Sequence, residues 1–249
     1  MIEQKIDVNC DFTNDTPQYW NKYWNDEMGG SFVDPDSKSA KLKYYHSVIW
    51  SKTLPNGQKM ELKTGSGSKY LTWNNYVFAS DSIIASFRYE KYRYMIKRVI
   101  DSLADYKSFM EYYTRKSYTI GGSIIFPKMV GSINQKRGWN PFIRDRFDLT
   151  LECIRRYYLG EKSPMYETLV KNKNFFDLFI DFKGYVDYFY LQDLVSEDYS
   201  NVKFWIETNV FEMNPFPKSV EEYLLWISNQ LKFVEKRNKR IELALLNNK

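Results

Sequence analysis

The central part of the chain reads SYTIGGSIIFPKMVGSINQKRGWNPFIRDRFDLTLECIRRYYLG, from Ser117 to Gly160. It passes from an apolar run, through a polar segment, into a strong helix signal. Asn140 is a favourable N-cap, Pro141 suits the first helical position, and Gly160 suits the residue after the last turn. Apolar residues recur between these caps every three or four positions, at Ile143, Phe147, Leu151, Ile154 and Tyr158. The spacing predicts an amphipathic helix at the centre of the fold.

The other faces of this predicted helix alternate acids and arginines. Arg144 and Asp148, like Glu152 and Arg156, are four residues apart, and each exposed pair would contribute only ~0.3–0.5 kcal/mol. Acids beside arginines at helical spacing favour ion pairs over a magnesium site. A single histidine and two distant cysteines also argue against zinc. We predict no metal and no cofactor.

The segment before the predicted helix is unusually polar. Asn134, Gln135 and Arg137 place amides and a guanidinium ahead of a helix N-terminus, a typical surface for binding an anion or a nucleotide edge. Together with Arg144 and Arg146 they would form an anion-facing side. Glycines would let backbone N–H groups approach the ligand, at Gly121, Gly122, Gly131 and Gly138. The alternative is ordinary loop capping, and neither a dinucleotide nor a P-loop motif is present.

Further helices and strands are predicted on both sides of this stretch. One helix should follow Thr16, a long apolar stripe predicts another from Ser82 to Tyr113, and a capping box starts a third at Ser219. Short strands are expected within 59–79 and 117–127. The fold class is therefore α+β, a mainly helical single domain over residues 1–249 with a few short strands.

Composition fits a folded, water-soluble chain of 249 residues, with 43% apolar, 27% charged and 18% aromatic residues. Most aromatics fall at helical core spacing, which predicts an aromatic-rich core rather than exposed stacking platforms. The net charge of +5 allows binding to a polyanion without requiring it. Cys10 and Cys153 cannot form a disulfide framework. Without a signal peptide or a long apolar run, we predict a cytoplasmic protein with no membrane contact.

The only histidine limits the catalytic chemistry. His46 lies beside the apolar face of a predicted helix over residues 40–52. A nuclease could use it as general base, with Lys52 or Arg137 stabilising the phosphate. The alternative is a structural histidine with all its hydrogen bonds made. A third hypothesis, an enzyme acting on a small molecule, requires a buried aromatic cavity lined by His46 and Arg137.

A second candidate surface is the acidic aromatic face over residues 175–199. Phenylalanines and tyrosines recur there at helical spacing, and six acids stand against Lys183. A basic run, Lys232 to Arg240, lies near the C-terminus. Solvated helix faces explain most such charge runs. The functional alternative is a non-catalytic module that binds a basic protein partner.

Three strings carry a resemblance to a known family: DTP at 15–17, YHSVIWSKTLPNG within 44–57, and INQKRGWNPFIRDRFDLTLECIRRYY at 133–158. They resemble a family of Gram-positive bacterial proteins known as a domain of unknown function. The resemblance covers nearly the whole chain and implies a single domain. It implies no activity. From the polar segment and its arginines, the leading prediction is a protein that binds, with processing as a further hypothesis, a nucleotide or nucleic acid.

Overall fold

The computed structural model describes residues 5–16, 35–66, 69–85, 87, 89–128, 132–207 and 209–247. It is 52% helical and carries one four-stranded antiparallel sheet, which confirms a mainly helical α+β fold. The predicted helix after Thr16, with Trp20, Trp24 and Gly29–Gly30, lies outside the described residues.

The sheet has the order β1-β2-β3-β4, and every neighbouring pair is antiparallel. Its strands are β1 (Lys63–Thr64), β2 (Leu71–Trp73), β3 (Tyr76–Ser82) and β4 (Ser123–Pro127). The longest ladder pairs Phe78 with Pro127 and Ser82 with Ser123. β4 is buried throughout, as expected for the apolar, β-branched run SIIF. The strands predicted within 59–79 and 117–127 are confirmed.

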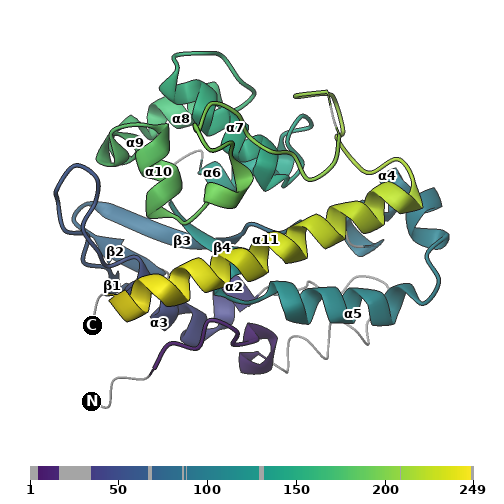
Figure 1. Ribbon diagram of the computed structural model, residues 1–249, viewed down its shortest axis with the longest axis horizontal. Helices are drawn as coiled ribbons and strands as arrows, with labels where there is room; N and C mark the ends of the chain where they lie inside the picture. Colours follow the sequence, from purple (N-terminus) through teal and green to yellow (C-terminus); the bar gives the residue numbers. More distant parts are fainter. Residues whose placement is uncertain are drawn as a thin grey trace.

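Helices cover the sheet and extend beyond it (Figure 1). The α-helices are α2 (Pro35–Lys38), α3 (Ala40–Ile49), α4 (Tyr89–Asp101), α5 (Tyr106–Ser117), α6 (Ile133–Trp139), α7 (Phe147–Tyr158), α8 (Tyr166–Lys171), α9 (Lys173–Phe176), α10 (Phe182–Tyr188) and α11 (Val220–Asn247). The 3₁₀ helices are η1 (Phe12–Asp15), η2 (Ile120–Gly122), η3 (Asp177–Phe179) and η4 (Gln192–Leu194). In Figure 1, α6 to α10 form a group on one side of α11, and α3 and α5 lie on the other.

The C-terminal helix α11 spans the long axis of the molecule (Figure 1). Its predicted start is confirmed, since the Glu222 amide donates to Ser219 Oγ at 3.2 Å. Polar side chains on its buried face bind the backbone of other elements. Gln230 Oε1 accepts from the Ala85 amide at 2.9 Å, and Asn238 Oδ1 accepts from the Gly121 amide at 2.7 Å. α11 therefore organises the core through hydrogen bonds as well as apolar contacts.

The double glycine before β4 serves this packing. A Cβ at Gly121 would lie 2.5 Å from the Val234 carbonyl oxygen of α11. A Cβ at Gly122 would lie 1.9 Å from the Ser117 carbonyl oxygen. These glycines let segments of the protein approach one another, which corrects the prediction that they admit a ligand. The Cβ of an alanine at Gly138 would meet the Asp145 carboxylate, and Gly131 lies outside the described residues.

The predicted central helix begins later than its sequence signals indicate. Residues 134–139, predicted as a loop, belong to α6, whose N-cap Ser132 accepts from the Gln135 amide. Asn140 Oδ1 accepts from the Phe142 amide at 2.9 Å, which forms a local turn instead of a helix cap. Arg144 and Asp145 then adopt positive φ angles, and α7 begins at Phe147. The prediction of a helix from residue 141 was wrong because this local turn competes with helix initiation.

The segment predicted as one helix, from Ser82 to Tyr113, falls in three elements: the end of β3, α4 and α5. Ser82 ends β3, and two helices, α4 and α5, follow it. Between them Asp105 adopts φ 50°, a left-handed conformation that interrupts the hydrogen-bond ladder. Helical periodicity continued across the break, so the pattern alone could not reveal it.

The aromatic-rich core is confirmed, and it is densest around η3 and α10. The ring centroid of Phe179 lies 5.2 Å from that of Tyr185 and 5.4 Å from that of Phe189. Gly184 lies inside α10. It permits the close approach of η3, because a Cβ there would lie 2.1 Å from the Phe179 carbonyl oxygen.

Replacing Gly184 with alanine should therefore destabilise the protein. The added methyl group meets backbone rather than a flexible side chain, so α10 or η3 must move. Such overpacking costs about 1–3 kcal/mol. Urea denaturation of Gly184→Ala and the wild type measures the difference. An unchanged free energy of unfolding would show that the two elements are not held at this distance.

Candidate functional site

Two of the arginines predicted to face an anion are internal. Arg137 is 1% exposed, pairs with Asp81 (Nη1–Oδ2 2.7 Å) and donates to the Ser82 and Asp145 carbonyls. Arg146 is 0% exposed and pairs with the equally buried Asp148 (Nη2–Oδ2 2.6 Å). Their guanidinium groups tie α6 to β3 and anchor the start of α7, so neither is presented to a ligand at the surface.

The other three predicted ligand residues are not gathered into one site. Asn134 Nδ2 donates to the Ser80 carbonyl, and Gln135 is exposed on α6. Arg144 is half-buried, and its Nε donates to Asn214 Oδ1 at 3.0 Å. Of the helix pairs predicted from spacing, Glu152–Arg156 is formed, whereas Arg144 bonds to Asn214 and Asp148 pairs with Arg146.

His46 lies inside the protein on α3. Its Nε2 is 3.1 Å from Ser123 Oγ, and its Nδ1 is 3.5 Å from the Tyr70 hydroxyl. Burial, and then the positive charge of Arg237, lower the pKa of His46 to about 3. The imidazole is therefore neutral at physiological pH. The arginine whose charge acts on His46 is Arg237 of α11, whereas Arg137, which the third hypothesis placed in one cavity with His46, pairs with Asp81.

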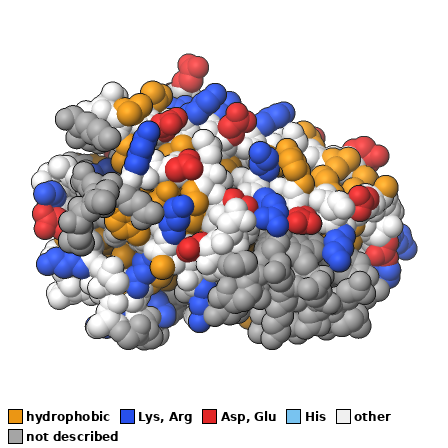
Figure 2. Space-filling view, turned by 90° about the horizontal axis from the view of Figure 1, so that it is seen from below, with side chains coloured by type: hydrophobic (Ala, Val, Ile, Leu, Met, Phe, Trp, Pro, Cys, Tyr) orange, Lys and Arg blue, Asp and Glu red, His pale blue; other side chains and the backbone are white. Residues whose placement is uncertain are grey.

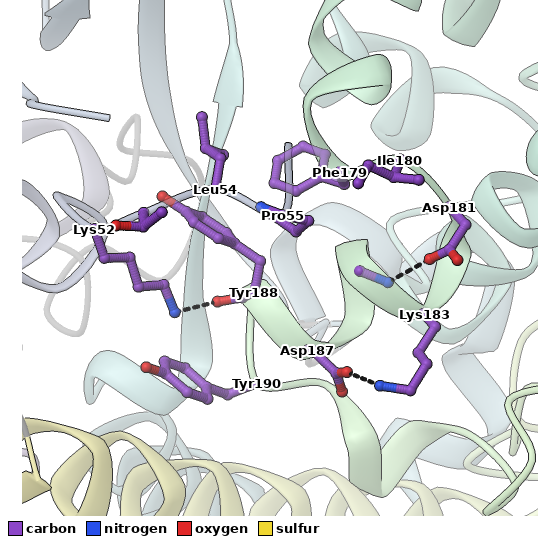
Figure 3. A pocket seen from close by; sticks show the side chains of 12 residues that line it. Lys52, Leu54, Pro55, Phe179, Ile180, Asp181, Lys183, Asp187, Tyr188 and Tyr190 are labelled. Atoms are coloured by element: carbon purple, nitrogen blue, oxygen red, sulfur yellow. Dashed lines mark hydrogen bonds and ion pairs between the residues drawn. The ribbon is translucent and has the colours of Figure 1, made fainter. Parts of the chain in front are cut away.

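Lys52, the other predicted catalytic residue, lies on the wall of a pocket of about 570 Å³ (Figure 3). The pocket is formed by the segment after α3, by η3 and by α10. Figure 3 shows Lys52 at one end, an apolar wall in the middle, and Asp181, Lys183 and Asp187 at the other end. Its lining comprises Lys52, Thr53, Leu54, Pro55, Phe179, Ile180, Asp181, Lys183, Gly184, Asp187, Tyr188 and Tyr190.

The Lys52 amine is surrounded by aromatic rings. Its Nζ donates to the Tyr188 carbonyl oxygen at 2.6 Å and lies 3.8 Å from the ring centroid of Tyr190. The rings of Tyr188 and Trp50 are 4.4 Å and 5.4 Å away. Lys52 forms no ion pair with any carboxylate in the described part of the chain. Within the described residues, Lys52 is therefore a half-buried amine without a counter-charge.

Burial, and then the charge of Arg237, lower the pKa of Lys52 from 10.5 to about 7. The aromatic rings favour the charged form of Lys52 and so raise its pKa, because a cation over an aromatic face is stabilised by ~0.5–2 kcal/mol. One pKa unit corresponds to about 1.4 kcal/mol, so the rings offset only part of the effect of burial. The amine therefore exchanges its proton closer to neutral pH than an ordinary lysine does.

Arg237 of α11 lies close to this pocket, inside the core. It is fully buried, its Nε donates to the Phe189 carbonyl, and its Nη1 donates to the Gly121 and Ser123 carbonyls. Its Nη2 has no hydrogen-bond partner, and no described carboxylate pairs with it. Burial lowers the pKa of Arg237, yet a guanidinium remains protonated at neutral pH. Its charge therefore adds to that of Lys52.

Sequence reasoning missed Arg237, which was grouped with the basic run at 232–240. A signal was present, because Arg237 follows Gln230 by seven residues and therefore shares the apolar face of the helix. A basic residue on the buried face of an amphipathic helix indicates an internal role.

Comparison with known proteins adds one result. The model of a family of unknown function, DUF6994, matches residues 6–241. The chain belongs to the DUF6994 family. The predicted resemblance to a family without an assigned function is thereby confirmed. Neither the curated proteins nor the solved structures contain a match.

Among the described residues, no group of three or more histidines, cysteines or acids is arranged to bind a metal ion. No described helix is both long and apolar enough to span a membrane. Cys10 and Cys153 are both free thiols.

Two residues lining the Lys52 pocket have unusual backbone conformations. Ile180 adopts φ 70° and Tyr190 adopts φ 55°. Positive φ is unfavourable for bulky side chains and rare for β-branched ones. Such residues concentrate at functional sites, where the surrounding structure holds them in place. Here they fix the apolar wall and the ring beneath Lys52.

The predicted acidic aromatic face is largely internal. Its rings at Phe175, Phe176, Phe179, Tyr185 and Phe189 are buried in the core. Its acids bind neighbouring residues: Asp187 pairs with Lys183 and accepts from the Tyr199 hydroxyl, and Asp181 caps α10 through the Gly184 amide. Asp193 pairs with Arg240 of α11 at 2.7 Å. Asp193 thus links the acidic segment to the basic end of α11.

Proposed function

We propose that this DUF6994 protein binds a small phosphorylated metabolite, a class that includes the nucleotides predicted from the sequence, in the Lys52 pocket. One observation carries the proposal: the pocket presents a lysine amine, flanked by aromatic rings, that has no carboxylate partner among the described residues. An uncompensated cation in a concave site is the usual counterpart of an anionic ligand.

The charge distribution supports an anion with more than one negative charge. The buried Arg237 adds its field to that of Lys52, and its positive charge contributes to lowering the pKa of the Lys52 amine. A phosphate group near Lys52 would relieve this repulsion. Electrostatic interactions are stronger where protein excludes water, so the half-buried position of Lys52 increases the gain.

The remainder of the pocket fits an organic group attached to the phosphate. Leu54, Pro55 and Ile180 supply an apolar wall against which a ring could pack. Asp181 and Asp187 at the far end could accept hydrogen bonds from sugar hydroxyls or an exocyclic amine. The volume of about 570 Å³ falls in the range of small-molecule sites, about 300–1,000 Å³.

The same geometry favours a small ligand over a nucleic acid strand. Binding to a strand depends on a continuous basic surface. Arg137 and Arg146, which the sequence placed on such a surface, are buried in ion pairs. On the face shown in Figure 2, acidic and basic side chains are interspersed over the described area. We retain the cytoplasm, where such metabolites occur, as the expected compartment.

A ligand panel tests the proposal. Thermal unfolding would be followed with inorganic phosphate, nucleoside mono-, di- and triphosphates and sugar phosphates, each matched to its unphosphorylated form. We expect a rise in melting temperature only with phosphorylated members. Lys59→Met, which changes an exposed lysine paired with Glu61, serves as control and should respond like the wild type. A panel without any phosphate-dependent rise would refute the proposal.

The affinity should depend on pH through Lys52. Because burial and Arg237 lower the pKa of this amine to about 7, the ammonium form predominates only below that pH. A phosphate binds the ammonium better than the neutral amine, so affinity should be highest below pH 7 and decrease as pH rises to 9. Isothermal titration at several pH values measures this. A ligand that is itself fully ionised throughout, such as a sulfate ester, separates the titration of Lys52 from that of phosphate.

A further inference from the structure

Lys52 combines features that make a lysine a nucleophile rather than only a cation. Its amine is half-buried, borders a pocket and has no acidic partner among the described residues. A second cation, Arg237, lies in the adjoining core and disfavours the ammonium form of Lys52. Desolvation and a neighbouring cation are the two means by which proteins activate lysine for attack on carbonyl groups.

Other pocket residues do not share this environment. Lys183 lines the same pocket but is exposed and paired with Asp187. Lys173, which lies outside the pocket lining, is also exposed and is paired with Asp177 at 2.5 Å. An ion pair with a carboxylate stabilises the ammonium form and withholds the lone pair that a nucleophile needs. Of the three lysines, Lys52 alone has rings and a backbone carbonyl in place of an acid.

We propose that Lys52 condenses with the aldehyde or ketone of an anionic ligand and forms an imine in this pocket. The inference rests on the proposed function only in requiring that a phosphorylated ligand enter the same pocket. Imine formation restricts the class of phosphorylated ligands to those that carry an aldehyde or ketone group. A nucleotide, which lacks a reactive aldehyde or ketone, would use Lys52 only as a cation.

The reaction balances without an oxidant or reductant. The Nζ lone pair attacks the carbonyl carbon, a C–N bond forms, and a proton moves from nitrogen to oxygen to give a carbinolamine. Uptake of one further proton from solvent lets the hydroxyl group leave as water, and the C=N bond forms. The product is a protonated imine, so the positive charge beside the ligand phosphate is retained.

The surroundings of Lys52 suit this product. The rings of Tyr188 and Tyr190 lie on either side of Nζ in Figure 3 and would flank a planar imine. Tyr190 has an unusual backbone conformation, with φ 55°, and its ring centroid lies 3.8 Å from the reacting nitrogen.

Reductive trapping tests the inference. The full chain would be mixed at pH 7 with substoichiometric pyridoxal 5′-phosphate, which carries an aldehyde and a phosphate, and then reduced with borohydride. Peptide mass spectrometry locates the stable secondary amine. At pH 7 an amine with pKa 10.4 is deprotonated about a thousandfold less often than one with pKa 7, although lower basicity reduces nucleophilicity. We therefore expect Lys52 to be labelled at least tenfold faster than Lys59 or Lys183.

Three controls separate reaction from binding. Pyridoxine 5′-phosphate has no aldehyde and should protect Lys52 from labelling. Pyridoxal has no phosphate and should label Lys52 more slowly. Lys52→Arg keeps the charge but cannot form the imine, so it should still bind pyridoxine 5′-phosphate and lose the trapped adduct. Circular dichroism shows whether each variant is folded.

The outcomes distinguish the two proposals. Labelling spread over exposed lysines, with Lys52 unlabelled although pyridoxine 5′-phosphate still raises the melting temperature, would overturn the imine and leave the phosphate site intact. Absence of both labelling and stabilisation would overturn both. Selective, protectable labelling of Lys52 that decreases when the phosphate is omitted supports both.

Discussion

Replacing Asp148 with asparagine is expected to lower the free energy of unfolding by about 3–5 kcal/mol, the typical cost of leaving a buried charge without its partner. Asp148 and Arg146 are both 0% exposed, and the carboxylate accepts from Arg146 Nε, Arg146 Nη2 and the Trp205 amide. The asparagine has almost the same shape, so the effect isolates the charge. Urea denaturation at pH 7 measures it.

An exposed pair on the same protein provides the control. Lys162 and Glu167 lie 3.8 Å apart with side chains 77% and 81% exposed. Glu167→Gln should change the free energy of unfolding by less than about 1 kcal/mol. If Asp148→Asn were equally mild, the central arginines would not be structural. Their assignment to an anion-binding surface would then have to be reconsidered.

Replacing Lys52 with methionine is expected to weaken binding of a phosphorylated ligand by about 10- to 150-fold, since a hydrogen bond to a charged group contributes ~1.5–3 kcal/mol. Methionine keeps much of the side-chain volume and remains compatible with the surrounding rings. Isothermal titration at pH 6.5 measures the change. Lys59→Met should bind like the wild type, and equal affinity in Lys52→Met would place the ligand elsewhere.

The same variant should also change how stability depends on pH. Lys52 has a pKa of about 7 in the folded protein and an ordinary value near 10.5 when unfolded. Between these values the unfolded state binds more protons, so this group makes the folded state more stable as pH rises from 7 to 10.5. Lys52→Met should lose that contribution. Thermal unfolding of both proteins over this range shows whether the melting temperature of the wild type rises relative to that of Lys52→Met as pH increases.

Local patterns predicted the fold class well. The strands, the aromatic core and the capped start of α11 depend on alternation, periodicity and cap residues close together in the chain. The errors arose where two local signals compete. Asn140 can cap a helix or form a turn with Phe142, and only the packing of α6 and α7 decides for the turn.

The site was harder to predict because charge in a sequence does not reveal burial. Arg137, Arg146 and Arg237 look like solvated or ligand-binding arginines, yet each lies inside the protein. Arg137 and Arg146 have acidic partners from β3 and α7, whereas Arg237 has only carbonyl groups. The sequence suggested Lys52 only as a phosphate-stabilising partner for His46 acting as general base. Its significance lies instead in residues 188–190 and in Arg237, which are distant in sequence.

The titration of Lys52 in the folded protein tests the account most directly. Nuclear magnetic resonance of the lysine ε-methylene groups, with Lys52 assigned through Lys52→Met, follows each amine from pH 5.5 to 9.5. We predict that Lys52 titrates near pH 7 and that inorganic phosphate or a phosphorylated ligand raises its pKa. A Lys52 resonance that does not titrate below pH 9, or whose titration no phosphate shifts, would contradict the account.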